Sequence, residues 1–196
     1  MTDKDLSAAL AANLDAAFEQ LALCYQRRLY AFALRMCGSP EDAEEIVQDA
    51  LVRAYRALRV YPGERVRALA LRPWLFQITV NVARNRARVR RPAVLSLQRH
   101  DEAELAEPAD DEREQPEIRA EHSERRRELA ALVLELPARY RAAVVLRHVD
   151  GLSYGEIAGI LDQPVGTVKA NVHRGVRALR ETLLTLPVAK ARGFSG

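Results

Sequence analysis

The sequence predicts an all-α protein made of two small helical domains joined by a flexible acidic linker. Alanine, leucine and arginine are abundant, only 9 of the 196 residues are glycine, and no alternating apolar pattern is long enough to indicate a sheet. Charge is strongly segregated: residues 1–91 carry 15 basic and 10 acidic side chains, residues 92–124 carry 3 and 11, and residues 125–196 carry 12 and 6. Two basic segments therefore flank an acidic one, which favours a polyanionic partner bound at two places.

The first domain, residues 1–91, begins with two amphipathic helices. Apolar residues at spacings of three and four predict a helix from Ala16 to Met36, ended by Gly38. Ser39 can cap the next helix, with Pro40 at its first position and carboxylates in its first turns, where the helix dipole favours them. Its apolar face leaves a compact acidic exterior, which is either a solvated face or a docking face for a basic partner. The members of this exterior are Asp42, Glu45, Gln48 and Asp49.

A turn at Tyr61–Glu64 precedes a third helix, expected from about Arg72 to Arg91. The residues expected on its buried side are Trp74, Leu75, Ile78, Val82 and Val89. Five arginines fall within residues 84–91. Cations complement the negative end of the helix dipole, but one or two are enough for that, so the excess indicates contact with phosphates.

The segment 92–124 is predicted to be the flexible linker. It contains Pro92, Pro108 and Pro116, few large apolar residues and the run DEAELAEPADDEREQPE. Such a composition cannot bury enough apolar surface to fold alone.

The second domain, residues 125–185, contains a helix-turn-helix pattern. Ser153 and Glu156 have the spacing of a capping box at the start of one helix, and Asp162-Gln163-Pro164 ends it. A second helix is expected from Val165 to about Leu184, with basic side chains away from its apolar face. The order of these features favours a helix in the DNA major groove over an ordinary helical hairpin with a solvated basic face. Residues 186–196 are expected to be a tail.

The rest of the sequence indicates no chemistry of its own. It has no glycine-rich phosphate loop, no HExxH and no CxxC, and its four histidines are scattered, so we expect no metal, no cofactor, no small-molecule substrate and no enzymatic activity. Cys24 and Cys37 are expected to be buried core residues; the alternative is a redox pair, which would need a helix bend to bring together two residues thirteen positions apart. No apolar run approaches the ~20 residues needed to cross a bilayer, and no signal pattern begins the chain, so a soluble cytoplasmic protein without membrane insertion is expected.

Three segments carry a family resemblance. One segment is similar to the part of extracytoplasmic-function (ECF) sigma factors that binds the RNA polymerase clamp; its sequence is SPEDAEEIVQDALVRAYRAL. A second is similar to the part that contacts the −10 promoter element; its sequence is RPWLFQITVNVARNRARVRR. A third stretch resembles the family's segment that binds the −35 promoter element; it runs from LPARYRAAVVLRHVDGLSYGEIAGIL to PVGTVKANVHRGVRAL. The chain is thus similar to a minimal sigma factor of the sigma-70 family, with a region 2 domain over 1–91 and a region 4 domain over 125–185.

The resemblance implies a role for each of these faces. Core RNA polymerase would be bound by Asp42, Glu45, Gln48 and Asp49. The −10 element would be met by Trp74, Gln77, Asn81, Arg84, Arg88 and Arg91. The −35 element would be met by Thr167, Lys169, Asn171, His173, Arg174 and Arg177. The implied partners are core polymerase, promoter DNA and an anti-sigma factor.

The chain departs from the family pattern at two places. Asn85 stands where aspartate is usual, and Ala170-Asn171 stands where Ser-Arg is usual. An amide at 171 pairs best with adenine, so the second departure points to an altered −35 preference or to weaker binding. The alternatives to a sigma factor are a LuxR-type helix-turn-helix activator, which would need neither the acidic segment nor the arginine-rich helix, a sigma-like decoy for an anti-sigma factor, and a nucleic-acid-processing enzyme, for which clustered carboxylates are lacking.

Overall fold

A computed structural model describes residues 2–90 and 116–185, which form two helical regions without a strand in the described ranges. The first region holds α1 (Asp3–Ala12), α2 (Leu14–Cys37), α3 (Pro40–Val60), α4 (Gly63–Arg67) and α5 (Leu71–Arg90). The second holds α6 (Pro116–Glu135), α7 (Ala138–Val144), the π-helical turn η1 (Val145–Val149), α8 (Tyr154–Leu161) and α9 (Val165–Thr185). The predicted all-α class is therefore confirmed.

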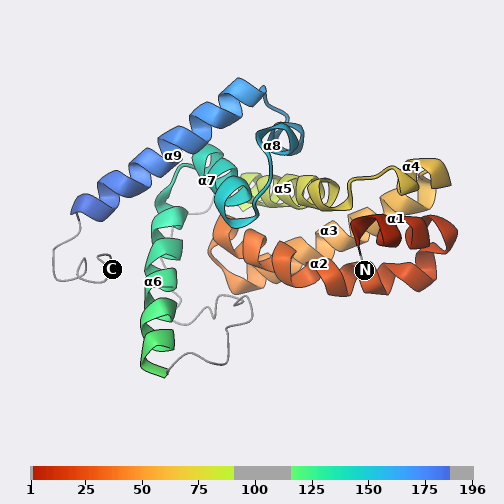
Figure 1. Cartoon of the computed structure of the whole chain (residues 1–196), viewed down its shortest axis with the longest axis horizontal. Helices are drawn as coiled ribbons and strands as arrows, with labels where there is room; N and C mark the ends of the chain where they lie inside the picture. The colour runs from red at the N-terminus through yellow and green to blue at the C-terminus, as the bar shows by residue number, and fades with distance from the viewer. Residues whose placement is uncertain (1, 91–115, 186–196) are drawn as a thin grey trace.

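Helices α2, α3 and α5 pack side by side and form the core of the first region (Figure 1). Phe32 of α2 and Phe76 of α5 meet edge to face with ring centroids 5.2 Å apart, and both are fully buried. Gly38 ends α2 with φ of +77°, a backbone conformation that glycine adopts without a Cβ penalty. Ser39 Oγ then accepts the Asp42 N–H at 3.2 Å and caps α3, whose first residue is Pro40, as predicted.

Helix α1 closes the other end of this bundle and is fixed by side-chain hydrogen bonds. A capping box joins Thr2 and Asp5 at its start. The Tyr25 hydroxyl of α2 donates to Asp3 Oδ1 at 2.6 Å, and Ser7 Oγ donates to the Leu69 carbonyl at 3.3 Å. Burial and the Asp3 carboxylate both raise the pKa of Tyr25, so this hydroxyl stays protonated and remains a donor.

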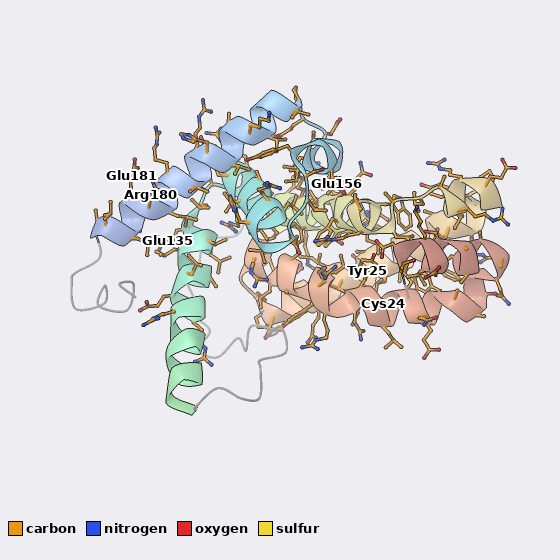
Figure 2. All side chains as sticks on the ribbon, in the orientation of Figure 1. Cys24, Tyr25, Glu135, Glu156, Arg180 and Glu181 are labelled. Atoms are coloured by element: carbon orange, nitrogen blue, oxygen red, sulfur yellow. The ribbon has the colours of Figure 1, made fainter. Side chains whose placement is uncertain are left out.

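Three details of the first region differ from the sequence-based expectations. Residues 63–67 form the short helix α4 where only a turn was expected. Val89 is 79% exposed and does not join the buried side of α5. Cys24 lies on the outer side of α2 and is exposed (Figure 2), because its neighbour Tyr25 takes the inward position.

The boundary predicted for the linker is also corrected. Residues 92–115 lie outside the described ranges, but residues 116–124 form the first turns of α6 instead of belonging to a linker. Pro116 fits the start of a helix, and the glutamate, arginine and alanine residues that follow are strong helix formers. Charge and proline content identified the segment, but they did not reveal where helix propensity takes over.

In the second region, α7 and α9 cross at close range. A Cβ at Gly175 of α9 would lie 2.5 Å from Val144 Cγ2 and 3.3 Å from Tyr140 Cβ, so only glycine fits at this point. Helix α8 packs against both α9 and α5, and its apolar residues Ile157, Ile160 and Leu161 are all buried. The two regions also contact each other, with α8 lying against α5 and the α6–α7 corner lying against the end of α2 (Figure 1).

Candidate nucleic-acid interface

The predicted helix-turn-helix is formed by α8, a three-residue connection and α9. Ser153 Oγ accepts the Glu156 N–H, and Glu156 Oε2 accepts the Ser153 N–H at 2.7 Å, which completes the predicted capping box. These hydrogen bonds from Ser153 lower the pKa of Glu156. Asp162 adopts a left-handed conformation with φ of 53°, and its N–H reaches the Ala158 carbonyl and ends α8. Val165 then starts α9 directly after Pro164.

Helix α9 presents a cationic face to solvent. Its inner side consists of Val168, Val172 and Gly175, which are buried against α7 and α8. Five of the six residues predicted for this face are exposed: Thr167, Lys169, His173, Arg174 and Arg177. The Lys169 ammonium lies 5.7 Å from the Tyr154 ring centroid, and Arg177 forms an ion pair with Glu181 one turn further along α9.

Asn171, the sixth of these residues, does not lie on this face. Its side chain is 5% exposed, and Nδ2 donates to Gln163 Oε1 in the turn at 3.1 Å. The reason is helical register, since position 171 follows Val168 by three residues and therefore faces inward with it. The expected base contact by Asn171 is corrected accordingly: the amide ties the turn to α9. The apolar periodicity of the helix could have revealed this.

Helix α5 brings the predicted −10 residues to one side of the first region. Trp74 is half-buried next to Tyr61, with ring centroids 6.2 Å apart, and the following residues of the set are exposed. They are Gln77, Asn81, Arg84 and Arg88. Arg91 lies outside the described residues. The structure thus places an aromatic platform, two amides and two guanidinium groups along one helix.

Two of these α5 side chains already bind the second region. Gln77 Nε2 donates to the Gly159 carbonyl at 3.1 Å, and an Arg84 guanidinium nitrogen lies 3.5 Å from the Leu161 carbonyl. Both acceptors belong to α8. Sequence reasoning missed this contact, because no local pattern indicates which surfaces of two separate domains will meet.

The acidic face of α3 is smaller than expected. Asp42 is buried, with Oδ1 3.4 Å from Arg86 Nε of α5, and Arg86 also pairs with Glu45. Asp42 therefore helps to hold α3 on α5 and does not lie on the acidic exterior. Glu45, Gln48 and Asp49 are exposed, and Gln48 lines a pocket of about 350 Å³ between α2 and α3 together with Tyr30 and Val47.

A charged junction between the two regions was also missed. Asp150, which directly precedes the helix-turn-helix, is 8% exposed, and the positive charges of Arg28, Arg35 and Arg72 act on it from α2 and α5. Burial outweighs their attraction and raises the pKa of Asp150 to about 6. Nearby, Arg141 of α7 donates to the Met36 carbonyl at 2.6 Å and to the Leu136 carbonyl at 3.0 Å.

Two helical regions that each present a basic helix are the arrangement of a protein that can bind nucleic acid at two places. Residues 21–92 match the family described as Sigma-70 region 2, and residues 126–179 match Sigma-70, region 4. The ECF RNA polymerase sigma-E factor of Escherichia coli (strain K12) is 35% identical over 183 residues, covering 91% of this chain and 93% of that protein. The RNA polymerase sigma-H factor of Pseudomonas aeruginosa is 33% identical over 174 residues, covering 87% and 88%.

Solved structures agree with these relatives. CnrH, solved in complex with the cytosolic domain of CnrY, has a TM-score of 0.63 and 25% identity, and the match covers 94% of this chain and 99% of that one. The sigma factor RpoE of Bartonella quintana has the same TM-score at 22% identity over 87% and 98%, which shows a shared fold. The chain belongs to the ECF sigma factor family of bacterial RNA polymerase, which is not a family of enzymes. Over residues 2–90 and 116–185, no helix combines the length and apolar character that spanning a membrane requires.

Proposed function

We propose that this sigma factor binds core RNA polymerase and reads a promoter at two places, with α9 at the −35 element and α5 at the −10 element. The observation that carries the proposal is the exposed basic face of α9, which stands on a capped helix-turn-helix. A helix in this position fits the major groove, where cationic side chains bind phosphates and base edges. Thr167, Lys169, His173, Arg174 and Arg177 make these contacts, while Asn171 supports them from within.

The α5 face is assigned to the −10 element because its groups suit an opened strand. Trp74 next to Tyr61 offers an aromatic surface for an extruded base, Gln77 and Asn81 offer amides, and Arg84 and Arg88 offer cations for the backbone. Extruding a base costs a few kcal/mol, which such stacking and phosphate contacts offset. Arg91 extends the same arginine series.

The outer side of α3 is assigned to the polymerase. Glu45, Gln48 and Asp49 are exposed there beside the pocket at Tyr30 and Val47, while Asp42 holds the face in place through Arg86.

RNA synthesis itself belongs to the polymerase, so the protein acts in the cytoplasm without catalytic residues of its own. A protein partner of the anti-sigma kind is supported by CnrH, which is solved in complex with the cytosolic domain of CnrY.

The alternatives have lost their basis. A LuxR-type activator does not need a region 2, yet residues 21–92 match one, and the relatives are similar over both regions. A decoy for an anti-sigma factor or a nucleic-acid-processing enzyme has no support in the relatives named above, which are sigma factors of RNA polymerase.

Run-off transcription with purified core polymerase on a promoter library tests the proposal. Arg174→Ala should reduce −35-dependent initiation about tenfold, since a good phosphate or base contact is worth about 1–3 kcal/mol. Arg180→Ala is the matched control, because Arg180 is another exposed arginine of α9 that lies toward the carboxyl end of the helix, beyond the residues proposed to contact DNA (Figure 2). Asn81→Ala should impair strand opening while closed complexes still form, which permanganate footprinting separates. Failure to bind core polymerase, with tight independent binding to duplex DNA, would refute the sigma assignment.

A further inference from the structure

The end of α8 that lies on α5 carries two carbonyls that accept hydrogen bonds from side chains of α5. The last carbonyls of any α-helix lack partners within the helix, and together they form the negative end of its dipole. In α8 the Ala158 carbonyl is taken by the N–H groups of Asp162 and Gln163. The Gly159 and Leu161 carbonyls accept instead from Gln77 and Arg84 of α5. The same side chains are assigned above to the −10 strand.

Gln77 and Arg84 of α5 therefore donate to carbonyls of α8 that resemble the hydrogen-bond acceptors of a DNA strand. A backbone carbonyl accepts from an amide as a base edge does, and a cation at a helix carboxyl end is stabilised as it is next to a phosphate. Gln77 and Arg84 cannot hold a DNA strand while α8 occupies this position. The strand can bind along α5 only after α8 has moved.

Three further contacts hold the regions together without using a proposed DNA residue. Leu134 of α6 packs on Gly38 at the end of α2, with both Cδ atoms 3.4 Å from the position that a Cβ of Gly38 would take. Arg141 of α7 donates to the Met36 carbonyl in the last turn of α2. Asp150 is buried where the charges of Arg35 and Arg72 act on it.

The −35 face, in contrast, is not involved in this contact. Thr167, Lys169, His173 and Arg174 are all exposed, and α9 extends away from the first region (Figure 1). The two DNA faces thus differ in the same structure: one is engaged by α8, and the other is open to solvent.

We propose that the free chain adopts this closed form in solution, in which the carboxyl end of α8 takes the place of the −10 strand on α5 while α9 remains free for duplex DNA. The proposal rests on the −10 and −35 assignments made above. Its consequence is an order of events: duplex contact by α9 is possible from the start, whereas contact with an opened strand requires the two regions to separate.

Two variants that open the closed form test the proposal in the full-length chain. Asp150→Lys places a cation where Arg28, Arg35 and Arg72 already act, and Leu134→Glu places a carboxylate on the apolar contact with Gly38. The matched controls lie on α6 and make the same chemical changes at exposed positions. They are Glu135→Lys and Leu129→Glu.

The readouts are the radius of gyration from small-angle X-ray scattering and binding of a labelled, randomised 12-nucleotide single strand, with circular dichroism as the check of folding. Both opening variants should have a larger radius of gyration than their controls. They should also bind the single strand roughly fivefold more tightly, because the open form, in which α8 has left α5, becomes fully populated. They change the net charge in opposite directions, so a general electrostatic effect cannot produce a gain in both. Binding of a randomised 20-base-pair duplex should match the controls within about twofold, because only the competent population of the −10 face changes.

The closed form and the competition between α8 and the strand are refuted by different outcomes. Equal radii of gyration for the wild type and both opening variants would refute the closed form. A larger radius of gyration, with single-strand binding equal to that of the controls, would show that α8 does not compete with the strand. That outcome would overturn the proposal that α8 takes the place of the −10 strand on α5. Larger radii without single-strand binding by any variant would refute the assignment of α5 to the −10 element, while the closed form would stand.

Discussion

At the scale of single residues, Asn171 shows how a side chain can change its role between sequence and structure. Its amide suits an adenine edge, and it stands in the middle of the recognition helix. In the folded protein it lies on the inner side of α9 and binds Gln163. The departure from the family pattern at this position thus concerns how the turn is held.

Asn171→Ala should therefore act on stability and leave the promoter preference unchanged. It removes a buried hydrogen bond and leaves Gln163 without its partner, which should lower the free energy of unfolding by about 1–2 kcal/mol. Chemical denaturation measures this loss, and selection of −35 sequences from a random library measures the preference. A changed base preference at one position, with stability unaffected, would mean that the amide reads DNA after all.

At the scale of elements, the start and end signals of the helices were the best predicted part of the fold. Ser39, Pro40 and Gly38 mark the joint between α2 and α3, and Ser153 with Glu156 marks the start of α8, because capping depends on residues close in sequence. The candidate −35 face was predicted for the same reason. The beginning of α6 at Pro116, the buried Asp42 and the contact of α8 with α5 were missed, since each depends on helix propensity or on partners far along the chain.

The crossing of α7 and α9 is another such long-range feature, and it depends on Gly175. Gly175→Ala should lower the free energy of unfolding of the second region by about 1–3 kcal/mol, because the new methyl group overlaps the buried Val144 side chain. Gly159→Ala is the control: it has open space around its Cβ position and should stabilise α8 by about 0.5–1 kcal/mol through helix propensity. Thermal unfolding followed by circular dichroism compares the two. Equal effects of both substitutions would contradict the close crossing.

At the scale of the whole molecule, the two regions share one buried carboxylate whose ionisation is coupled to their contact. Asp150 lies at the junction, where Arg28 and Arg35 of α2 and Arg72 of α5 act on it. Among the described residues, Asp150 Oδ2 and Arg72 Nε are buried without a hydrogen-bond partner. The desolvation of the carboxylate therefore exceeds the attraction of the arginines, and the pKa is raised to about 6.

This raised pKa gives the closed form a definite pH dependence. In the open form Asp150 is in water and has an ordinary pKa near 3.8, so the closed form binds the extra proton between that value and about 6. The contribution of Asp150 to closure is fully present below the lower value and is lost as the pH rises through about 6. The radius of gyration of the full-length chain should accordingly be smaller at pH 5 than at pH 7.5.

Asp150→Asn provides the test of this cause, because the amide has the shape of the carboxyl group and does not ionise. This variant should stay compact at both pH values, and its radius of gyration should no longer change between them. Because the other titratable groups are unchanged, an equal pH dependence in the variant would show that another group controls closure. A variant that is more open than the wild type at pH 7.5 would mean that the attraction of the three arginines outweighs the desolvation of Asp150.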